Sequence, residues 1–362
     1  MKLVAVILAG GLGSKLWPKS TESKPKQFTH SIGDGTMLQN TFTRISTIFP
    51  TDNIYIITNE EYTDIVKEQL PALSDDHVIA EPFGRNTAPA LALVQTILSR
   101  KYDENTVLCS FPSDHIISNL GEFKESLHNA AEFAFEKEAI VTLGINPTRP
   151  DTQYGYVQID EDPADLGKYY EKGIRYSRNF AEKPDPGTAE RFLESGDFLW
   201  NSGIFFWKFR TFYEKFDKHL PDHSKNFKEL STYLDSKDFY KELIYTYKKI
   251  DSISVDYGIL ERVDNVYVVK SSFEWTDLET WDELYRISMK DGRGNVIEGE
   301  VININTKDSF ISTNEKLIGV VDLEDIIVID TDHGILICKR GSSDKVQEII
   351  DYMRRKNINK YL

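Results

Sequence analysis

The chain has 362 residues, of which 40% are hydrophobic and 12% aromatic, and its formal net charge is −15. This length suits one large domain with a smaller one, or two domains. The negative charge argues against non-specific nucleic-acid binding, which needs a basic surface. No apolar run approaches the ~18 residues of a membrane span, so we expect neither nucleic acid nor a membrane as a partner.

Two cysteines, Cys109 and Cys338, are too few for a disulfide framework. Both lie in apolar, strand-like runs, which predicts buried thiols. The apolar run at residues 3–8 is too short for the core of a signal peptide. We therefore expect a cytoplasmic protein.

The apolar run at residues 4–8 is typical of a buried strand, and Gly10, Gly11 and Gly13 follow it. Glycine has no Cβ and tolerates positive φ, so such a turn can approach a bulky ligand and bind an anion through its N–H groups. Four lysines follow within one stretch: Lys15, Lys19, Lys24 and Lys26. In a chain of this net charge, clustered cations indicate a polyphosphate site. On the glycines alone, a strand turn followed by solvated lysines fits equally well.

Two common glycine motifs are excluded. A P-loop needs glycine directly before Lys-Ser/Thr, but Ser14 separates Gly13 from Lys15. A dinucleotide fingerprint needs a third glycine that opens a helix, and Pro18 argues against a helix that runs on at that place.

Strand-like and helix-like runs alternate up to residue 144. The strands are expected at 4–8, 54–58, 78–80, 106–111 and 140–144, and the helices at 37–49, 62–70, 88–100 and 123–137. This alternation predicts a Rossmann-like α/β fold, with a mostly parallel sheet flanked by helices and ligands beyond the carboxyl ends of the strands. Residues 208–250 are expected to form two more helices.

The alternation of strand-like and helix-like runs ends near residues 289–294, a short polar stretch that contains glycine. Six short β-rich runs follow between residues 296 and 339, and a helix is expected at 345–356. We therefore predict a catalytic domain over residues 1–288 and a small β-helix-like or mixed β domain over residues 289–362.

Several polar residues come just after predicted strands. Asp114 follows one beside the glycine loop, where a carboxylate suits Mg²⁺, although such a residue more often caps a turn; His115 is read as structural or orienting. Asn86 or Thr87 can cap the helix at 88–100. Asn201 precedes an apolar strand expected at 204–207.

Seven ordered motifs within residues 1–285 resemble those of the sugar nucleotidyltransferase family, in particular its mannose-1-phosphate guanylyltransferases (GDP-mannose pyrophosphorylases). They include LAGGLGSKLWP with PKQF, EPFGRNTAPA, PSDH, TQYGY, FAEKP and WTDLETW. The resemblance implies the nucleotide-diphospho-sugar transferase fold. It also implies a Mg²⁺-dependent transfer of GMP from GTP to mannose 1-phosphate, with attack on the α-phosphorus and release of pyrophosphate.

The resemblance also implies residue roles. It assigns catalysis to Lys15 and Lys26 and metal binding to Asp114 and Asp277. Nucleotide binding is implied for residues at strand ends and in the glycine loop: Leu8, Gly10, Gly11, Gly13, Arg85, Asn86, Thr87 and Ser113. Binding of the sugar phosphate is implied for Gly155, Glu182, Lys183 and Asn201.

Two positions depart from the family pattern. Lys15 stands where the family usually has arginine, and so lacks the planar bidentate fork. Glu279 replaces a glycine and adds charge beside Asp277. Another sugar 1-phosphate, ATP, or a binding protein without turnover remain alternatives. Similar enzymes use their C-terminal part for assembly, so a homodimer is expected. From the length that follows the β-rich runs, we do not expect the extra isomerase domain of some longer relatives.

Overall fold

The computed structural model describes residues 1–30, 33–162 and 166–362. By compactness the chain divides into unit 1, which holds residues 1–10, 41–113 and 117–275, and unit 2, which holds residues 11–40, 114–116 and 276–362. This grouping differs from a division at residue 288, because the lysine-bearing loop packs with the C-terminal part of the chain. The domain boundary at residue 288 stays a prediction.

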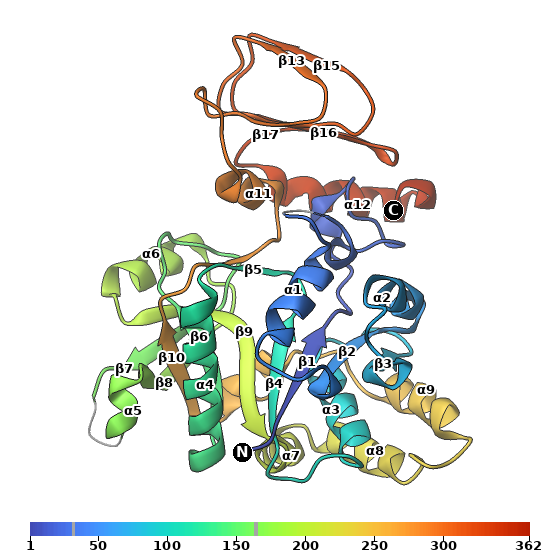
Figure 1. Cartoon of the computed structure of the whole chain (residues 1–362), viewed down its shortest axis with the longest axis vertical. Helices are drawn as coiled ribbons and strands as arrows, with labels where there is room; N and C mark the ends of the chain where they lie inside the picture. Colours follow the sequence, from blue (N-terminus) through green and yellow to red (C-terminus); the bar gives the residue numbers. More distant parts are fainter. Residues whose placement is uncertain (31–32, 163–165) are drawn as a thin grey trace. The chain divides into compact units, whose positions relative to one another are not determined.

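A nine-stranded sheet with the order β3-β2-β1-β4-β9-β6-β10-β8-β7 forms the centre of unit 1 (Figure 1). The four strands from β3 to β4 are parallel, as expected, whereas β9 runs antiparallel to both β4 and β6. The α/β class is thus confirmed, and the second half of the sheet is mixed. The strands are β1 (Leu3–Leu8), β2 (Ile54–Asn59), β3 (Val78–Glu81), β4 (Val107–Pro112), β6 (Ile140–Ile145), β7 (Tyr156–Asp160), β8 (Ile174–Ala181), β9 (Phe198–Lys208) and β10 (Val266–Ser271).

Helices lie on both sides of this sheet (Figure 1). They are α1 (Met37–Ser46, which continues from unit 2), α2 (Thr63–Gln69), α3 (Thr87–Leu98), α4 (Leu120–Lys137), α5 (Lys168–Glu171), α6 (Pro186–Ser195), α7 (Phe209–His219), α8 (Pro221–Ser231), α9 (Phe239–Lys249) and α10 (Val255–Gly258). The apolar helix α3 shares one core with α7, α8 and α9. None of the helices in the described residues is long and apolar enough to cross a membrane.

Four local predictions need correction. Residues 208–250 form three helices instead of two, because Pro221 opens α8 directly after Leu220 ends α7. Helix α4 begins three residues early, since the Asn119 side chain caps it. Asn201 lies inside β9, which begins at Phe198. Cys109 is buried as expected, but Cys338 is only half-buried, on an edge strand.

Unit 2 has two tryptophans at the centre of its core. The Nε1–H group of Trp281 donates to the backbone oxygen of Trp17 (3.0 Å), and that of Trp17 donates to the oxygen of Tyr361 (2.7 Å). Both indoles pack against apolar residues of the C-terminal strands and helices. The tryptophan-bearing motifs at residues 17 and 281 therefore join the first loop to the C-terminal region within this unit.

The C-terminal strands of unit 2 wind in stacked coils, which confirms the predicted β domain (Figure 1). Val301 pairs with Ile318, Phe310 pairs with Ile327, and the Asn305 amide donates to Asp322 (2.9 Å), a repeat of 17 residues. Between β12 and β14 the repeat is 14 residues, since Val296 pairs with Phe310. The elements are β5 (His115–Ile117), β11 (Trp275–Asp277), α11 (Trp281–Ile287), β12 (Val296–Glu298), β13 (Val301–Ile304), β14 (Phe310–Ser312), β15 (Ile318–Val321), β16 (Ile326–Thr331), β17 (Gly334–Lys339) and α12 (Val346–Arg355).

Candidate active site

Lys26 lies at the centre of a charged cluster in unit 2. Its ammonium is 2.9 Å from a carboxylate oxygen of Asp114 and 3.4 Å from one of Asp277. It also donates to the backbone oxygen of Leu278 at 3.0 Å, and the residue is only 7% exposed. The short strands β5 and β11 pair with each other, which brings the two aspartates together although 163 positions separate them in the sequence.

The charged groups of this cluster shift one another's pKa values. Burial alone would lower the pKa of Lys26, but the carboxylates of Asp114, Asp277 and Glu279 outweigh burial and raise it. Burial raises the pKa of Asp277 to about 7, with Asp114 and Glu279 adding to the rise and Lys26 opposing it. The pKa of Asp114 is lowered, because Lys26 and His115 outweigh the effect of its burial. The ammonium therefore keeps one of two adjacent carboxyl groups firmly ionised.

The same residues fit a divalent cation. Asp114, His115 and Asp277 each offer a ligand atom, and these atoms lie within 4.8 Å of one another. Two of the three are carboxylate oxygens, which hard cations such as Mg²⁺ prefer. His115, which the sequence left with an orienting role, is the third potential ligand.

Lys15 contacts Glu279, the other residue that departs from the family pattern. Its ammonium lies 2.6 Å from a carboxylate oxygen of Glu279, and the two side chains are 30% and 19% exposed. No sequence pattern indicates that the two departures touch, because 264 residues separate them. The structure thus places an added carboxylate directly against the lysine that replaces arginine.

The glycines of the first loop have different surroundings. Gly13 has a φ of +50°, and a Cβ there would lie 2.5 Å from Cγ and 2.8 Å from the backbone nitrogen of Lys26. Gly13 is therefore needed for close packing of the loop on Lys26. At Gly11 a Cβ would meet nothing within 4 Å, so this position has room for a ligand.

In unit 1, the predicted nucleotide residues cluster at strand ends. Leu8 ends β1, and its backbone oxygen accepts from the N–H group of Ser113 (3.1 Å). A Cβ on Gly10 would stand 3.3 Å from a carboxylate oxygen of Glu81 and 3.7 Å from the side-chain oxygen of Asn59. Sequence reasoning missed both acceptors, although Glu81 opens a quoted motif and each residue ends a strand.

The start of α3 is arranged as predicted. Asn86 caps it, with its side-chain oxygen accepting from the Thr87 N–H group (2.9 Å). The Thr87 hydroxyl accepts from the N–H group of Val255, and the Arg85 guanidinium donates to the backbone oxygen of Tyr247 (3.0 Å). Arg85 and Thr87 therefore fix the segment around residues 247–255, so a structural role is evident, whereas contact with a nucleotide stays a prediction.

The predicted sugar residues form a second cluster in unit 1. A Cβ on Gly155 would lie 2.3 Å from a carboxylate oxygen of Glu182, so a side chain at position 155 would displace that carboxylate. The Asn201 amide donates to Asp256 (3.0 Å), and its oxygen accepts from the Thr142 hydroxyl (3.0 Å). Burial raises the pKa of Asp256 to about 6.

Lys183 belongs to the same cluster. It has a φ of +47°, unusual for a residue with a side chain. Its charge opposes the rise in the pKa of Asp256, so the two groups lie close enough to interact. The sequence indicates either a structural role or a role in the sugar site for Asp256, and the structure joins it to the predicted sugar residues through Asn201.

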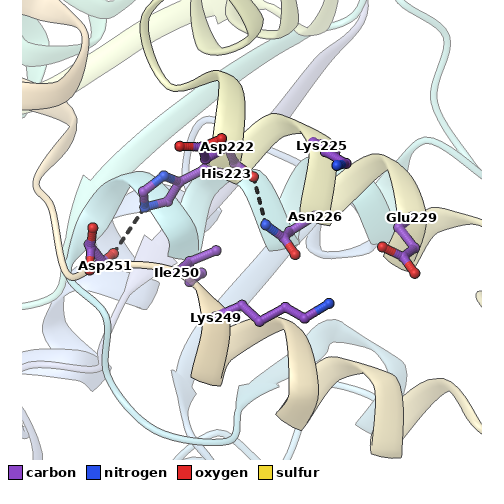
Figure 2. Close-up of a pocket in the computed structure, with 8 residues that line it drawn as sticks. All are labelled: Asp222, His223, Lys225, Asn226, Glu229, Lys249, Ile250 and Asp251. Atoms are coloured by element: carbon purple, nitrogen blue, oxygen red, sulfur yellow. Dashed lines mark hydrogen bonds between the residues drawn. The ribbon is translucent and has the colours of Figure 1, made fainter.

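A separate cavity of about 360 Å³ lies beside α8 and α9 (Figure 2). His223 Nε2 hydrogen-bonds the backbone oxygen of Asp251 (3.0 Å), and Asn226 donates to that of Asp222 (2.7 Å). These polar groups stabilise the helix ends around the cavity, which contains none of the residues predicted for the site.

Two family models match successive parts of the chain. The family model described as nucleotidyl transferase matches residues 4–294, and the one described as MannoseP isomerase/GMP-like beta-helix domain matches residues 299–353. Mannose-1-phosphate guanylyltransferase 2 of Escherichia coli O157:H7 is 33% identical over 365 aligned positions, covering 99% of this chain and 75% of that protein. Mannose-1-phosphate guanylyltransferase of Klebsiella pneumoniae is 34% identical over 362 positions, with the same coverage of both. A crystal structure described as mannose-1-phosphate geranyltransferase from Thermus thermophilus has a TM-score of 0.86 and 26% identity, covering 98% of this chain and 100% of that one.

Proposed function

Because the chain belongs to the nucleotidyl transferase family, among the mannose-1-phosphate guanylyltransferases, we propose that it transfers GMP from GTP to mannose 1-phosphate. The products are GDP-mannose and pyrophosphate. The observation that carries the proposal is the buried cluster of Lys26 with Asp114 and Asp277, which joins a cation to a carboxylate pair that fits a metal.

This transfer reaction depends more on positioned positive charges than on a general base. An oxygen of the sugar phosphate attacks the α-phosphorus, and the bond from that phosphorus to the bridging β-phosphate oxygen breaks in line. The attacking phosphate is already anionic at pH 7, since its second pKa is about 6. The barrier is therefore mainly repulsion between phosphates, which preorganised cations lower.

We assign Lys26 and Lys15 to charge neutralisation on the triphosphate. Both ammonium groups are held by carboxylates, Lys26 between Asp114 and Asp277 and Lys15 by Glu279. Asp114 and Asp277 would hold Mg²⁺, which, when bound, neutralises further phosphate charge. In unit 1, Glu182 and Asn201 would bind sugar hydroxyls, with Lys183 on the sugar phosphate.

The test is a matrix of four nucleoside triphosphates against several sugar 1-phosphates, with pyrophosphate release as the readout. We expect GTP with mannose 1-phosphate and Mg²⁺ to give the highest kcat/KM. If pyrophosphate is released only with a different sugar 1-phosphate, that sugar 1-phosphate is the substrate and the type of reaction stays the same. No release with any pair, together with tight GTP binding, would establish a binding protein without turnover.

A homodimer is also proposed, from an apolar face of unit 2. Ile302 and Ile304 of β13 and Val321 of β15 are each more than half exposed, and Ile304 and Val321 are register partners on one face. Two more exposed apolar residues, Leu317 and Leu323, flank β15. Contiguous apolar patches on a monomer are uncommon and often mark an interface.

Sedimentation of Ile304→Lys tests the dimer, with Ile337→Lys, at a still more exposed position on another sheet, as the control. We expect the first variant alone to sediment as a monomer. A dimeric Ile304→Lys variant would contradict the assigned surface. The cytoplasmic location stays a prediction from the sequence.

A further inference from the structure

Three polar side chains on one face of α12 form a stripe along the helix: Gln347, Asp351 and Arg354. The two ends of this stripe contact the first loop of unit 2. The Ser14 hydroxyl donates to the side-chain oxygen of Gln347 (3.0 Å). The Arg354 guanidinium pairs with the Glu22 carboxylate (2.8 Å). The helix α12 therefore holds the loop at two separate points.

Asp351 stands between the other two side chains of the stripe. Its carboxylate accepts from the amide nitrogen of Gln347 (2.9 Å) and lies 3.8 Å from the guanidinium of Arg354. Because an ionised carboxylate can only accept, the nitrogen of the Gln347 amide must face Asp351, and its oxygen then faces Ser14. The stripe thus fixes the direction of the bond that Gln347 makes with the loop.

The neighbouring face of α12 is apolar and packs on the same loop. Val346, Ile350 and Met353 are buried in one core with Leu16 and Trp17. A surface hydrogen bond or ion pair between two mobile segments contributes little, because ordering both of them costs entropy. Here the buried apolar side chains already fix the helix against the loop, so the polar stripe acts from a rigid support.

The contact between Gln347 and Ser14 lies next to groups that suit a triphosphate. The Ser20 hydroxyl donates to the backbone oxygen of Gly13 (2.6 Å). In a trans peptide the N–H group points away from the side of the carbonyl oxygen, so the N–H group of Ser14 points away from Ser20. N–H groups presented in this way by a glycine turn can bind an anion. Lys15, which we assign to the triphosphate, is the next residue.

We propose that Gln347 is a positioning residue for the transfer reaction. Through the Ser14 hydroxyl it holds the N–H group of Ser14 and the ammonium of Lys15 where the triphosphate binds. This inference rests on the proposed function and deepens it, because it makes a helix near the C-terminus part of the arrangement that binds GTP. Gln347 itself does not touch the nucleotide.

The expected effect is on GTP binding and not on the chemical step. If the loop adopts its binding position in only a fraction of the molecules, the apparent Kd rises by the inverse of that fraction. Loss of one hydrogen bond of this kind corresponds to roughly a three- to tenfold change. Because saturating GTP restores the binding position, the KM for GTP should rise by this factor while kcat stays nearly the same.

The same coupling must act in the opposite direction. A contact that strengthens GTP binding is itself strengthened by bound GTP, and by the same factor. The backbone amides of α12 should therefore exchange hydrogen more slowly when GTP is bound, and Gln347→Leu should remove this effect. This measurement does not require turnover.

The experiment compares Gln347→Leu with Glu348→Leu, the same replacement at the next and exposed position of α12. We expect the KM for GTP to rise roughly three- to tenfold in the first variant only, with kcat and the KM for mannose 1-phosphate unchanged. Gln347→Glu combined with Asp351→Asn keeps an acceptor for Ser14 and reverses the bond between the two helix positions. This exchange variant should restore the wild-type KM, which a merely structural loss would not predict.

Circular dichroism melting shows whether the variants fold. An unchanged KM for GTP in folded Gln347→Leu overturns the proposal, and so does an equal rise in the KM for both substrates. An exchange variant that binds GTP as weakly as Gln347→Leu also overturns it. Should Gln347→Leu not fold, hydrogen exchange of α12 in the wild type decides, and exchange that GTP leaves unchanged refutes the coupling.

Failure of the proposed function gives a different result. If the wild type releases no pyrophosphate with any substrate pair, the transfer reaction is wrong. Calorimetric titration with GTP and hydrogen exchange of α12 in wild type, Gln347→Leu and Glu348→Leu then still test Gln347 on its own. A Kd for GTP that rises only in Gln347→Leu supports the positioning role, and equal Kd values in all three proteins overturn it.

Discussion

Replacement of Lys26 by methionine tests the charged cluster most directly. Methionine has a similar length and no charge, so Lys26→Met removes the ammonium and leaves Asp114 and Asp277 facing each other in a buried place. Loss of one partner of a buried ion pair typically costs about 3–5 kcal/mol. The lost bond to the Leu278 oxygen, 3.0 Å long, adds about 1 kcal/mol.

Without the ammonium, the two carboxyl groups should share a proton or a divalent cation. We therefore expect Lys26→Met to unfold about 4–6 kcal/mol more easily without metal, and Mg²⁺ to restore more stability to the variant than to wild type. In the proposed reaction, loss of this preorganised charge should lower kcat by roughly a hundredfold or more.

Urea unfolding followed by tryptophan fluorescence measures the first effect, because Trp17 and Trp281 lie in the core of the same unit. Lys24→Met is the matched control, since Lys24 is exposed in the same loop. Pyrophosphate release measures the second effect. A Lys26→Met protein that is as stable as the control and turns over at the normal rate would refute the reasoning.

Three other predictions use the same reasoning about charge. Replacement of Glu279 by glycine should lower the KM for GTP several-fold, because its carboxylate competes with phosphate for Lys15; a double-mutant cycle with Lys15→Met checks this, and additive effects would contradict it. Asp277→Asn should weaken the dependence of the rate on magnesium, and an unchanged magnesium titration would count against the metal assignment. Burial raises the pKa of Glu81 to about 8 from the ordinary 4.5, so the folded state holds a proton that the unfolded state releases, and stability is lost as pH rises from 4.5 through about 8. At ~1.4 kcal/mol per pH unit the loss reaches about 5 kcal/mol, and Glu81→Gln should flatten this part of the urea-unfolding profile; an equally steep profile would show that the carboxyl titrates normally.

The parts of the fold that depend on local pattern were predictable. The apolar run at residues 4–8 forms the buried strand β1, and β1 pairs in parallel with β2 and β4 as the alternation of strands and helices predicts. The cap at Asn86 follows from its side chain, which can satisfy an N–H group at the start of α3. Each of these features is decided by residues close together in the chain.

Other features depend on contacts that no local pattern contains. The antiparallel placement of β9 between β4 and β6 is set by tertiary pairing, so a mostly parallel sheet was the natural expectation. The contact between Lys15 and Glu279 spans 264 residues and joins two departures that look unrelated in sequence. The burial of Glu81 beside Asn59 follows from the pairing of β2 with β3, which a sequence does not show.

The charge of the unit 2 cluster explains why a metal suits this chain. Two ammonium groups, on Lys15 and Lys26, stand among three carboxyl groups, on Asp114, Asp277 and Glu279. With all of them ionised, the cluster has no net positive charge to offer a triphosphate. A phosphate can form an ion pair with one of these lysines only if the lysine separates from its carboxylate. That carboxylate then needs another cation. Asp114 and Asp277 would hold a divalent ion that supplies this cation, so the carboxylate at position 279 should couple nucleotide binding to the metal more tightly than a glycine would.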